Sequence, residues 1–325
     1  MTNTPYTTLL IVVRNEKDYI GRAITSLLNQ DYPETKKEII IIDGMSNDGT
    51  REYIFEQLKI HPEIKLLDNP NKILASGWNI GIKAAKGEFV CRIDAHNEPE
   101  KDYISKGIDY IVNKQNIACI GGLEINTGTT FWGEIAADLY TSKFGAGAAA
   151  YRSGLNSVQE TDTAKCAIYP KSIFEKFGYF NESLGRNQDL EFHQRLVKNE
   201  LVILTNPEMK NKYFVRSSPK KLLKKGFDDG FWTAYSGSYY LRHLVPMLFL
   251  ICLVLVTVGF IIFTSKATLI IFLSPILLYT IFALYFAFSD GKTFASKLLL
   301  TFIFFLYHIV YGFGSLVGFI KKVFN

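Results

Sequence analysis

Three long apolar stretches in the last third of the chain limit the folds that are open to it. They cover residues 244–265, 267–289 and 298–320, each is 22 or 23 residues long, and none contains Lys, Arg, Asp or Glu. About 20 apolar residues are needed to cross the hydrocarbon core of a bilayer. A helix that is apolar on every face is buried either in a large core or in a membrane. We therefore expect a membrane domain of three hydrophobic helices from residue 241 to 325.

The first 240 residues have the composition of a soluble domain. Their charged residues are evenly scattered, and the first apolar run, residues 9–13, is short and has no basic flank, so it predicts a buried strand rather than a secretory signal. The four cysteines show no paired or metal-type spacing, which favours reduced thiols. We expect residues 1–240 to lie in the cytoplasm, attached to the inner (cytoplasmic) membrane by a multi-pass membrane domain.

The charges near the apolar stretches give a mixed signal on orientation. With residues 1–240 inside, three crossings place Lys321 and Lys322 outside, whereas Lys292 and Lys297 lie inside, as the positive-inside tendency prefers. The last two lysines therefore argue weakly against three crossings. A re-entrant segment, or a segment that lies along the membrane surface, is the alternative.

Strand-like and helix-like segments alternate through the first hundred residues. Short apolar runs predict strands at residues 9–13, 38–42, 64–67 and 88–93. Helices are expected at residues 19–29, at 75–85, and after the turn "DGMSNDGT", where Ser46, Asn47 or Asp48 can cap a helix that ends near Lys59. Such alternation predicts an α/β domain with a mostly parallel mixed sheet that helices cover on both faces.

Polar side chains follow three of the predicted strands. Arg14 and Glu16 come after the first strand, Asp43 ends the second, and Asp94 and His96 follow the last, in "CRIDAHNEP". Two positions apart in an extended segment, Asp94 and His96 would point to the same face. Ligands of open parallel sheets bind beyond the carboxyl ends of the strands. These residues could merely form polar loops, but acidic groups at one edge repel each other unless they have partners. The pattern therefore favours a site for a cation and a nucleotide.

The second half of the soluble part has weaker signals. Small residues at 145–150 predict a mobile loop, with a tightly packed turn as the alternative, and apolar runs at 201–204 and 212–215 predict two further strands. Residues 209–227 hold seven Lys or Arg and no acid, which favours contact with an anionic membrane surface or a diphosphate over a merely solvated face. Nucleic acid is not expected, because base-stacking aromatic residues are not interleaved with these charges.

Four segments resemble the family 2 glycosyltransferases. They are "IVVRNEKDYI", "EIIIIDGMSNDGT", "NPNKILASGWNIGIKAAKGEFVCRIDAH" and "NQDLEFHQRL", in this order between about residues 10 and 196. The chain is similar to the bacterial exopolysaccharide branch typified by succinoglycan glucosyltransferases, through its Asp-Ala-His motif, its "FGAGAAAYR" loop and its "DTAKCAIYPKSIFEKFGYF" segment. Members of that branch often end in membrane spans. The resemblance implies a GT-A nucleotide-sugar-binding fold and an inverting transferase.

The resemblance also implies roles for the polar residues at the strand ends. Asp43 would contact the uracil or ribose end of a UDP-sugar, with Arg14 and Glu16 nearby. Asp94 and His96 would stand where the family has its Asp-x-Asp pair, which meets the donor diphosphate and its divalent cation. Such a cation acts as a Lewis acid on the leaving phosphate. We expect Mn²⁺ or Mg²⁺, and an imidazole ligand favours Mn²⁺.

By the same resemblance Asp189 is the catalytic base, and two departures accompany it. Gln188 stands where the family usually has Glu, which removes a charge beside the base. The Gln-x-x-Arg-Trp element of processive synthases is absent, and "KKGFDDGFW" in its place keeps only Trp232, so a processive polymer synthase is not expected. Arg152 and Arg195, with Gln188 and Trp232, are further candidates for contacts to the acceptor or to a loop.

The combined features predict an enzyme that moves one sugar from a nucleotide-sugar to a lipid-linked glycan acceptor, in exopolysaccharide or surface polysaccharide synthesis. One alternative is transfer to polyprenyl phosphate. Another is a catalytically silent membrane scaffold of a glycan assembly complex, but the joint presence of Asp43, Asp94, His96 and Asp189 argues against it. Other glycan assembly proteins are further candidate partners. The sugar, the linkage and the acceptor are left open by these residues.

Overall fold

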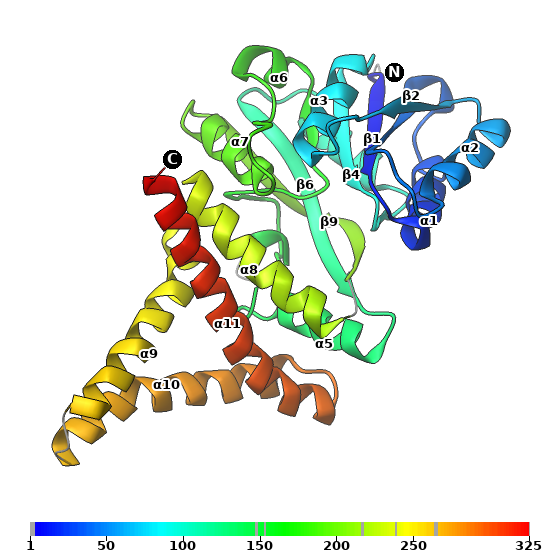
Figure 1. Ribbon diagram of the computed structural model, residues 1–325. Helices are drawn as coiled ribbons and strands as arrows, with labels where there is room; N and C mark the ends of the chain where they lie inside the picture. The colour runs from blue at the N-terminus through cyan, green and yellow to red at the C-terminus, as the bar shows by residue number, and fades with distance from the viewer. Residues whose placement is uncertain are drawn as a thin grey trace. The chain divides into compact units, whose positions relative to one another are not determined.

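The chain forms two compact units (Figure 1). The computed structural model describes residues 4–146, 149–152, 154–215, 218–237, 239–262 and 266–324. The first unit comprises Met1–Ile125 and Ala150–Phe214, and the second comprises Asn126–Ala149 and Val215–Asn325. The boundary between the two units falls near Phe214, and an internal segment belongs to the second unit. The division at residue 240 into a soluble and a membrane domain stays a prediction.

The first unit is built on a mixed sheet whose first four strands are parallel. They pair in the order β3-β2-β1-β4. Their bounds are Thr7–Val13 for β1, Lys37–Asp43 for β2, Ile64–Asp68 for β3 and Phe89–Asp94 for β4. All four expected strands of this half are confirmed, and so is the α/β class. Parallel pairing places the carboxyl ends of these strands at one edge of the sheet.

The second half of the sheet contains both antiparallel and parallel strand pairs. It continues in the order β4-β8-β6-β9-β5, with β7 paired to β9. The bounds are Asn97–Pro99 for β5, Ile117–Thr127 for β6, Gln159–Glu160 for β7, Ile168–Pro170 for β8 and Val202–Phe214 for β9. The expectation of two separate strands at 201–204 and 212–215 was wrong, because the polar middle of β9 stays extended, with Met209 and Asn211 buried between exposed neighbours.

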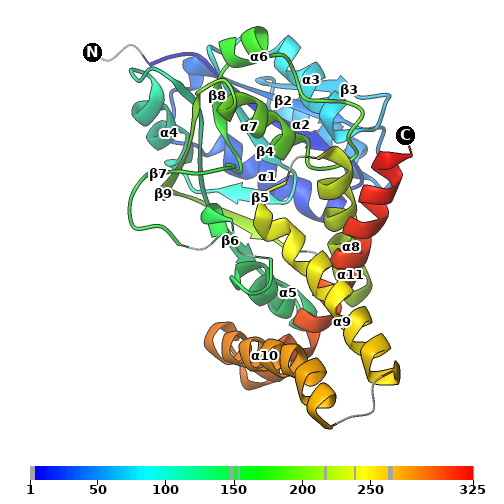
Figure 2. The ribbon, with the colours of Figure 1, turned by 90° about the vertical axis from the view of Figure 1, so that its left-hand side faces the viewer.

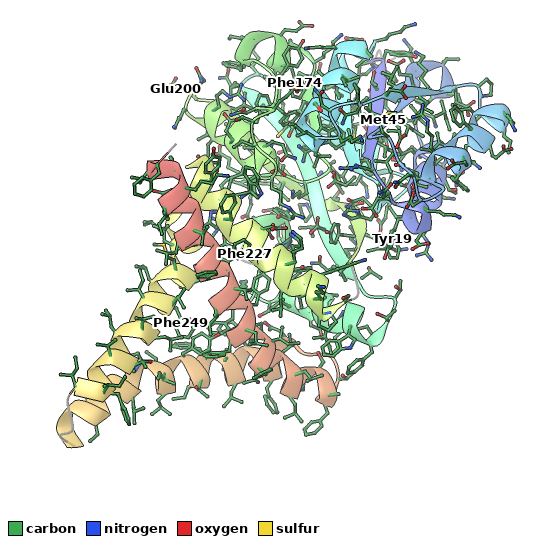
Figure 3. The ribbon with its side chains drawn as sticks, viewed as in Figure 1. Tyr19, Met45, Phe174, Glu200, Phe227 and Phe249 are labelled. Carbon is green, nitrogen blue, oxygen red and sulfur yellow. The ribbon has the colours of Figure 1, made fainter. Side chains whose placement is uncertain are left out.

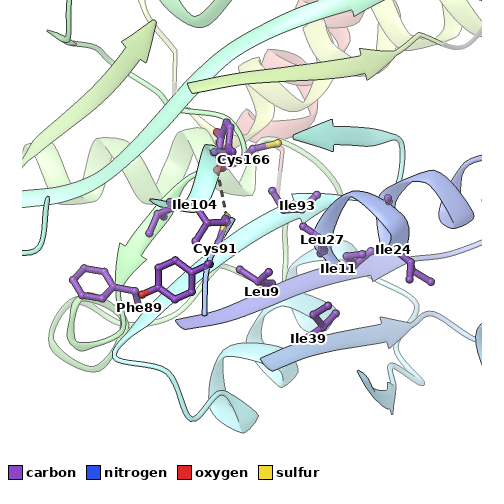
Figure 4. Close-up of a cluster of buried hydrophobic side chains, with 14 of the residues drawn as sticks. Leu9, Ile11, Ile24, Leu27, Ile39, Phe89, Cys91, Ile93, Ile104 and Cys166 are labelled. Atoms are coloured by element: carbon purple, nitrogen blue, oxygen red, sulfur yellow. Dashed lines mark hydrogen bonds between the residues drawn. The ribbon is translucent and has the colours of Figure 1, made fainter. Parts of the chain in front are cut away.

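Helices cover both faces of the sheet. Alternate residues of β1 explain how: Leu9 and Ile11 belong to a core under α1, α2 and α4, whereas Leu10 and Val12 belong to a core under α3, α6 and α7. Figure 4 shows the first of these cores. The helix bounds are Lys17–Leu28 for α1, Thr50–Ile60 for α2, Leu74–Ala84 for α3, Tyr103–Ile111 for α4, Ser172–Phe177 for α6 and Gln188–Val197 for α7.

The second unit consists of helices. Their bounds are Phe131–Thr141 for α5, Pro219–Ser236 for α8, Val245–Ile262 for α9, Lys266–Asp290 for α10 and Phe294–Val323 for α11. The segments Leu241–Ile262, Leu273–Asp290 and Phe294–Phe324 are helical and are long and apolar enough to cross a membrane. The three expected apolar helices are therefore present, although residues 263–265 at the end of the first stretch lie outside the described residues.

Two other expectations fall partly outside the described residues. Of the small-residue loop at 145–150, residues 147 and 148 are not described, and the chain enters a short 3₁₀ helix at Ala150–Arg152. Of the basic run, Arg216 is not described, and the other basic residues lie in β9 and in α8.

Candidate active site

Asp43 ends β2 as a fully buried carboxylate. It accepts hydrogen bonds from the backbone N–H of Ser46 (3.2 Å), from the Ser46 hydroxyl (2.6 Å) and from Nη1 of Arg51 (2.8 Å). A buried carboxylate requires such partners, because an unpaired charge is costly to remove from water. The turn after β2 and the first turn of α2 therefore fix Asp43 at the carboxyl edge of the sheet.

Asp68 and Arg51 extend this arrangement to the next strand. Asp68 lies opposite Asp43 in the β2–β3 register, and Nη2 of Arg51 is 2.7 Å from its carboxylate. Hydrogen bonds to Asp43 and Asp68 raise the pKa of Arg51 above its ordinary value. Neither Arg51 nor Asp68 was predicted. Asp68 ends its strand as Asp43 does, which is the signal that could have identified it, whereas Arg51 has no comparable signal in the sequence.

The loop between β1 and α1 brings Arg14 and Glu16 to the same edge. The backbone N–H of Glu16 donates to the hydroxyl of Thr50 (2.9 Å), which ties this loop to the start of α2. The stem of Arg14 lies against Gly44, where a Cβ would be 3.1 Å from the Arg14 Cβ. Arg14 and Glu16 are therefore held beside the turn that follows Asp43, as the parallel strand order predicts.

Asp94 ends β4, and His96 lies in the two-residue turn that follows it. The chain is extended only as far as Asp94, so the direction of the His96 side chain is not set by the strand period, contrary to the extended geometry that we assumed. The imidazole of His96 packs edge-on against Tyr213, with the ring centroids 4.7 Å apart, and its Nδ1 is 3.9 Å from the carboxylate of Glu16. The structure thus makes Glu16 a neighbour of His96.

The side chains at this turn suit a divalent cation whose coordination a ligand completes. Among the residues that the structure describes, no three His, Cys, Asp or Glu side chains form a group that could hold a metal. Asp94 and His96 offer one carboxylate and one imidazole. Cations of nucleotide sites are commonly held by one or two protein groups together with substrate phosphates and water. The donor set therefore fits a cation that is shared with a diphosphate.

Asp189 lies in the first turn of α7 and is almost completely buried. Its Oδ2 accepts from Nζ of Lys165 at 2.6 Å and from Nη2 of Arg92 at 3.2 Å. Burial by itself would raise the pKa of the Asp189 carboxyl, but the two positive charges outweigh burial and hold this pKa well below its usual range. Asp189 is therefore an ionised carboxylate between two cations, and neither cation was predicted from the sequence.

The two cations differ in their surroundings. Arg92 is buried and its guanidinium stacks on the rings of Trp78 (5.1 Å) and Phe180 (5.3 Å). A buried guanidinium is stable only with a counter-ion, and Asp189 supplies it. The Lys165 side chain is 26% exposed, so it reaches the surface of the site. Asp189 thus contacts one cation that is buried in the core, Arg92, and one that solvent can reach, Lys165.

Arg92 links Asp189 to the strand that ends in Asp94. Arg92 and Asp94 are two residues apart in β4, so their side chains point to the same face of the sheet, and Arg92 binds Asp189. Burial would lower the pKa of Lys165, but the charge of Asp189, followed by Tyr151 and Asp94, outweighs burial and raises this pKa. Asp94 and Asp189, which lie far apart in the sequence, are therefore on the same face of the sheet.

Two further candidates, Arg152 and Gln188, are in the first unit. Nε of Arg152 is 3.0 Å from Oε1 of the buried Glu124, so this arginine forms an ion pair that was not predicted. Gln188 is buried directly before Asp189, and its Oε1 has no hydrogen-bond partner in the described part of the chain. A contact of either residue with an acceptor stays a prediction.

Arg195 and Trp232 have other neighbours. The guanidinium of Arg195 donates to the carbonyl oxygens of Phe177 (2.7 Å) and Tyr179 (2.9 Å), so it fixes the chain between α6 and α7. Trp232 lies on α8 in the second unit and packs edge-on against Phe231. A contact of either residue with an acceptor stays a prediction.

The chain belongs to glycosyl transferase family 2, because the model of that family matches residues 8–178. This range includes Asp43, Asp94 and His96, and it ends before Asp189. The predicted family membership is therefore confirmed, and the protein is a glycosyltransferase of this family.

Individual relatives agree with this assignment. The chain is 29% identical over 97% of its length to the "Dolichyl N-acetyl-alpha-D-glucosaminyl phosphate 3-beta-D-2,3-diacetamido-2,3-dideoxy-beta-D-glucuronosyltransferase" of Methanococcus voltae, of which it covers 98%. It is 26% identical over 69% of its length to the succinoglycan biosynthesis protein ExoA of Rhizobium meliloti, of which it covers 68%. A mannosyltransferase of Pyrobaculum calidifontis, solved with GDP-Man and Mn²⁺, has a similar fold (TM-score 0.58, 15% identity, 99% of this chain and 88% of that one). The fold is thus GT-A-like.

Proposed function

We propose that the protein transfers one sugar, with inversion, from a UDP-sugar to a lipid-linked saccharide. The observation that carries the proposal is the charged site of the first unit, in which an ionised Asp189 binds Lys165 and binds Arg92, which stands two residues before Asp94 in β4. The relative from Methanococcus voltae matches almost the whole chain, and its name describes transfer of a sugar to a dolichyl-linked saccharide phosphate. A family 2 chain with such a relative and with helices that are apolar enough to cross a membrane suits a lipid-linked acceptor.

The donor would occupy the carboxyl edge of the parallel strands. Asp43 and Arg51 would bind its nucleoside end, with Arg14 and Glu16 beside them, because these groups already form one network there. Asp94 and His96 would hold Mn²⁺ or Mg²⁺ against the diphosphate. A bound cation would stabilise the charge that develops on the leaving phosphate.

Asp189 would act as the base. The acceptor hydroxyl attacks the anomeric carbon from the face opposite the diphosphate. The bond between the anomeric carbon and the diphosphate oxygen breaks, and its electron pair stays on that oxygen. The hydroxyl proton passes to the Asp189 carboxylate. Asp189 is ionised, so it can receive the proton, but its two cations make it a weak base. The accessible Lys165 must therefore shift when the acceptor binds, and we expect it to move towards a phosphate.

Incubation of the detergent-solubilised full chain with separate UDP-sugars and Mn²⁺ tests the proposal. Polyprenyl phosphate bearing one N-acetylglucosamine is the expected acceptor, and bare polyprenyl phosphate is the alternative. The proposal is supported if the saccharide acceptor gives a product that is heavier by one sugar and bare polyprenyl phosphate gives none. A product that forms only with bare polyprenyl phosphate would support transfer to polyprenyl phosphate instead. If no donor and acceptor combination gives a product, and no donor is hydrolysed, a silent scaffold would be favoured.

The metal ligands can be tested on the same preparation. His96→Ala should raise the Mn²⁺ concentration needed for half-maximal donor binding, and Asp94→Ala should raise it further, because a charged ligand is lost. His96→Asp should recover part of the binding and shift the preference towards Mg²⁺. A His96→Ala variant with an unchanged metal requirement and a lower melting temperature would show that the histidine is structural.

We further propose that the protein acts at the cytoplasmic membrane with its first unit in the cytoplasm, where nucleotide-sugars are made. Other glycan assembly proteins stay candidate partners, and co-purification from crosslinked membranes would identify them.

A further inference from the structure

The last apolar helix differs from the two before it in how much of it is buried within the second unit. In the most apolar window of α11 39% of the residues are buried, compared with 11% in each of the other two candidate spans. The exposed large apolar residues of α9 are distributed around that helix, as expected of a helix in lipid. The surroundings of α11 therefore decide whether it crosses the membrane.

The C-terminal half of α11 runs along α8 (Figures 1 and 2). Glycines allow the two backbones to touch: a Cβ at Gly314 would be 2.2 Å from the carbonyl oxygen of Phe227, and one at Gly230 would be 2.1 Å from the carbonyl oxygen of Tyr311. Near the end of α11, Nζ of Lys321 lies over the ring of Tyr235 at 5.6 Å. This half of α11 is therefore bound to α8 along its length.

α8 cannot lie in the hydrocarbon core. It carries the ion pairs Lys224–Asp228 (2.8 Å) and Lys225–Asp229 (2.6 Å), and the Lys224 side chain is 71% exposed. Charged side chains are rare and costly within the bilayer. In addition, only residues 215–218 separate β9 from α8, and four residues span at most about 14 Å, less than half of a bilayer core. α8 is therefore on the side of the membrane where the sheet is.

The first turn of α11 is held on that same side by α5. Asp138 of α5 is buried, and its Oδ2 accepts from the hydroxyl of Ser296 (2.5 Å) and from the backbone N–H of Lys292 (3.2 Å). Residues 128–130 alone separate β6 from α5, too few to cross a membrane. Both halves of α11 are thus bound to helices that the chain connects directly to the sheet.

The exposed apolar residues of α11 form one stripe. They are Phe294, Leu298, Phe302, Phe313, Ile320 and Val323, and Phe324 directly after the helix continues the stripe. At roughly 100° per residue, they fall within an arc of about 120° on a helical wheel, and the buried residues such as Leu300, Ile303 and Tyr307 fall on the other side. An exposed apolar face on one side, with the other side packed against protein, is typical of a helix that lies in the membrane interface.

We propose that α11 lies along the membrane surface on the side of the sheet and that only α9 and α10 cross the membrane, as a hairpin. The bilayer covers the apolar stripe of α11. The end of α9 at Ile262 and the start of α10 at Lys266 then face the opposite compartment, and Lys292, Lys297, Lys321 and Lys322 all lie on the side of the sheet. For a sheet in the cytoplasm this agrees with the positive-inside tendency, which three crossings violate at Lys321 and Lys322.

Single-cysteine labelling of the full chain tests this topology. In a Cys252→Ala background the other cysteines are buried. The test positions are Ile262→Cys at the end of α9 and Phe324→Cys after α11, which are 63% and 82% exposed, and Lys59→Cys on α2 marks the side of the sheet. Intact spheroplasts are treated with a membrane-impermeant polyethylene glycol maleimide, and a second sample is treated after permeabilisation.

We expect Ile262→Cys to react in intact spheroplasts, and Phe324→Cys and Lys59→Cys to react at least ten-fold more after permeabilisation. Reaction of Phe324→Cys in intact spheroplasts would show that α11 crosses the membrane and would overturn the proposal. Protection of Ile262→Cys to the same degree as Lys59→Cys would overturn it too, because α9 would then not cross. Val323→Cys, which is 79% exposed, provides a second position for α11, and labelling in sodium dodecyl sulfate confirms that each cysteine is reactive. No outcome depends on the catalytic activity.

Discussion

The carboxylate of Asp189 is shared by Arg92 and Lys165, so its surroundings fit two roles. It neutralises a buried arginine, as a structural counter-ion does, and it contacts a partly exposed lysine at the surface of the site. A counter-ion would be required for stability alone, whereas a base would be required for turnover. The two roles therefore predict different behaviour for variants that change one partner at a time.

Asp189→Asn should lower turnover at least 10²-fold and leave nucleotide binding nearly unchanged, because the amide keeps the shape of the side chain but cannot take up the proton. Steady-state kinetics and calorimetric titration with UDP measure the two effects. Arg92→Met is the control for the structural role, since it removes the buried cation and leaves the carboxylate. If both variants lose activity only in proportion to their loss of melting temperature, Asp189 is a counter-ion and not the base.

Lys165→Met should move the acidic limb of the kcat/KM profile to higher pH. Lys165 and Arg92 lower the pKa of Asp189, and the base works only when ionised, so activity is lost as the pH falls through this pKa. Without Lys165 this pKa rises and the loss begins at a higher pH. Lys165→Arg should leave the acidic limb of the kcat/KM profile at its wild-type pH. Lys171→Met is a matched control, because Lys171 binds the carbonyl oxygen of Ala85 instead. An unmoved limb in Lys165→Met would contradict the role of Asp189 as the titrating base.

At the scale of elements, the contact between α8 and α11 depends on glycines. Figure 3 shows Phe227 on α8, whose carbonyl oxygen occupies the position that a side chain at Gly314 would need. Backbone cannot rotate out of the way as a side chain can. The two helices therefore approach closely enough for backbone contact, and a larger residue at this position must separate them.

Gly314→Ala should destabilise the second unit by about 1–3 kcal/mol, the usual range for overpacking. Gly226→Ala is the control at the same contact, because its added Cβ would meet the ring of Tyr307 at 2.9 Å, and a ring edge can move. Melting temperatures of both variants in detergent measure the difference. A loss for Gly226→Ala equal to or greater than that for Gly314→Ala would show that backbone contact is not what limits this interface.

At the scale of the whole molecule, the three helices that are apolar enough to cross a membrane have different surroundings. Large apolar residues of α9 are exposed over most of the helix, although Val256 and Gly259 are buried, whereas α11 is bound to α5 and α8 on one side. Hydropathy alone does not separate the two cases, because both helices exceed the length and apolarity of a membrane span.

A single lysine substitution in each helix distinguishes α9 from α11. Val254→Lys in the middle of α9 should impair membrane insertion, since a lysine at the centre of a span costs about 2.5–3.5 kcal/mol. Phe313→Lys on the exposed stripe of α11 should leave insertion and melting temperature nearly unchanged, because a lysine at the interface reaches water. Both positions are about half exposed, 55% and 52%, so the comparison is matched. Equal loss of membrane-integrated protein in the two variants would indicate that α11 spans the bilayer.

The sequence by itself determined the elements whose signals are local. Apolar runs that end in Asp43 and Asp94 defined two parallel strands and the edge at which polar residues gather, because an apolar run is a local signal and the alternation of strands with helices favours a parallel sheet. The motifs also predicted family membership correctly. β9 was divided in error, since its polar middle can be recognised as strand only when Met209 and Asn211 are seen to be buried.

Only the tertiary structure decided which charges meet. Asp189 binds Arg92 and Lys165, and Arg51 joins Asp43 to Asp68, through contacts between side chains on different elements. No local pattern encodes such pairs, because burial and distance set their energies and both arise only when the sheet and its helices pack. The same holds for α11: its length and apolar composition allow it to cross a membrane, and only its contacts with α5 and α8 support the proposed location along the membrane surface.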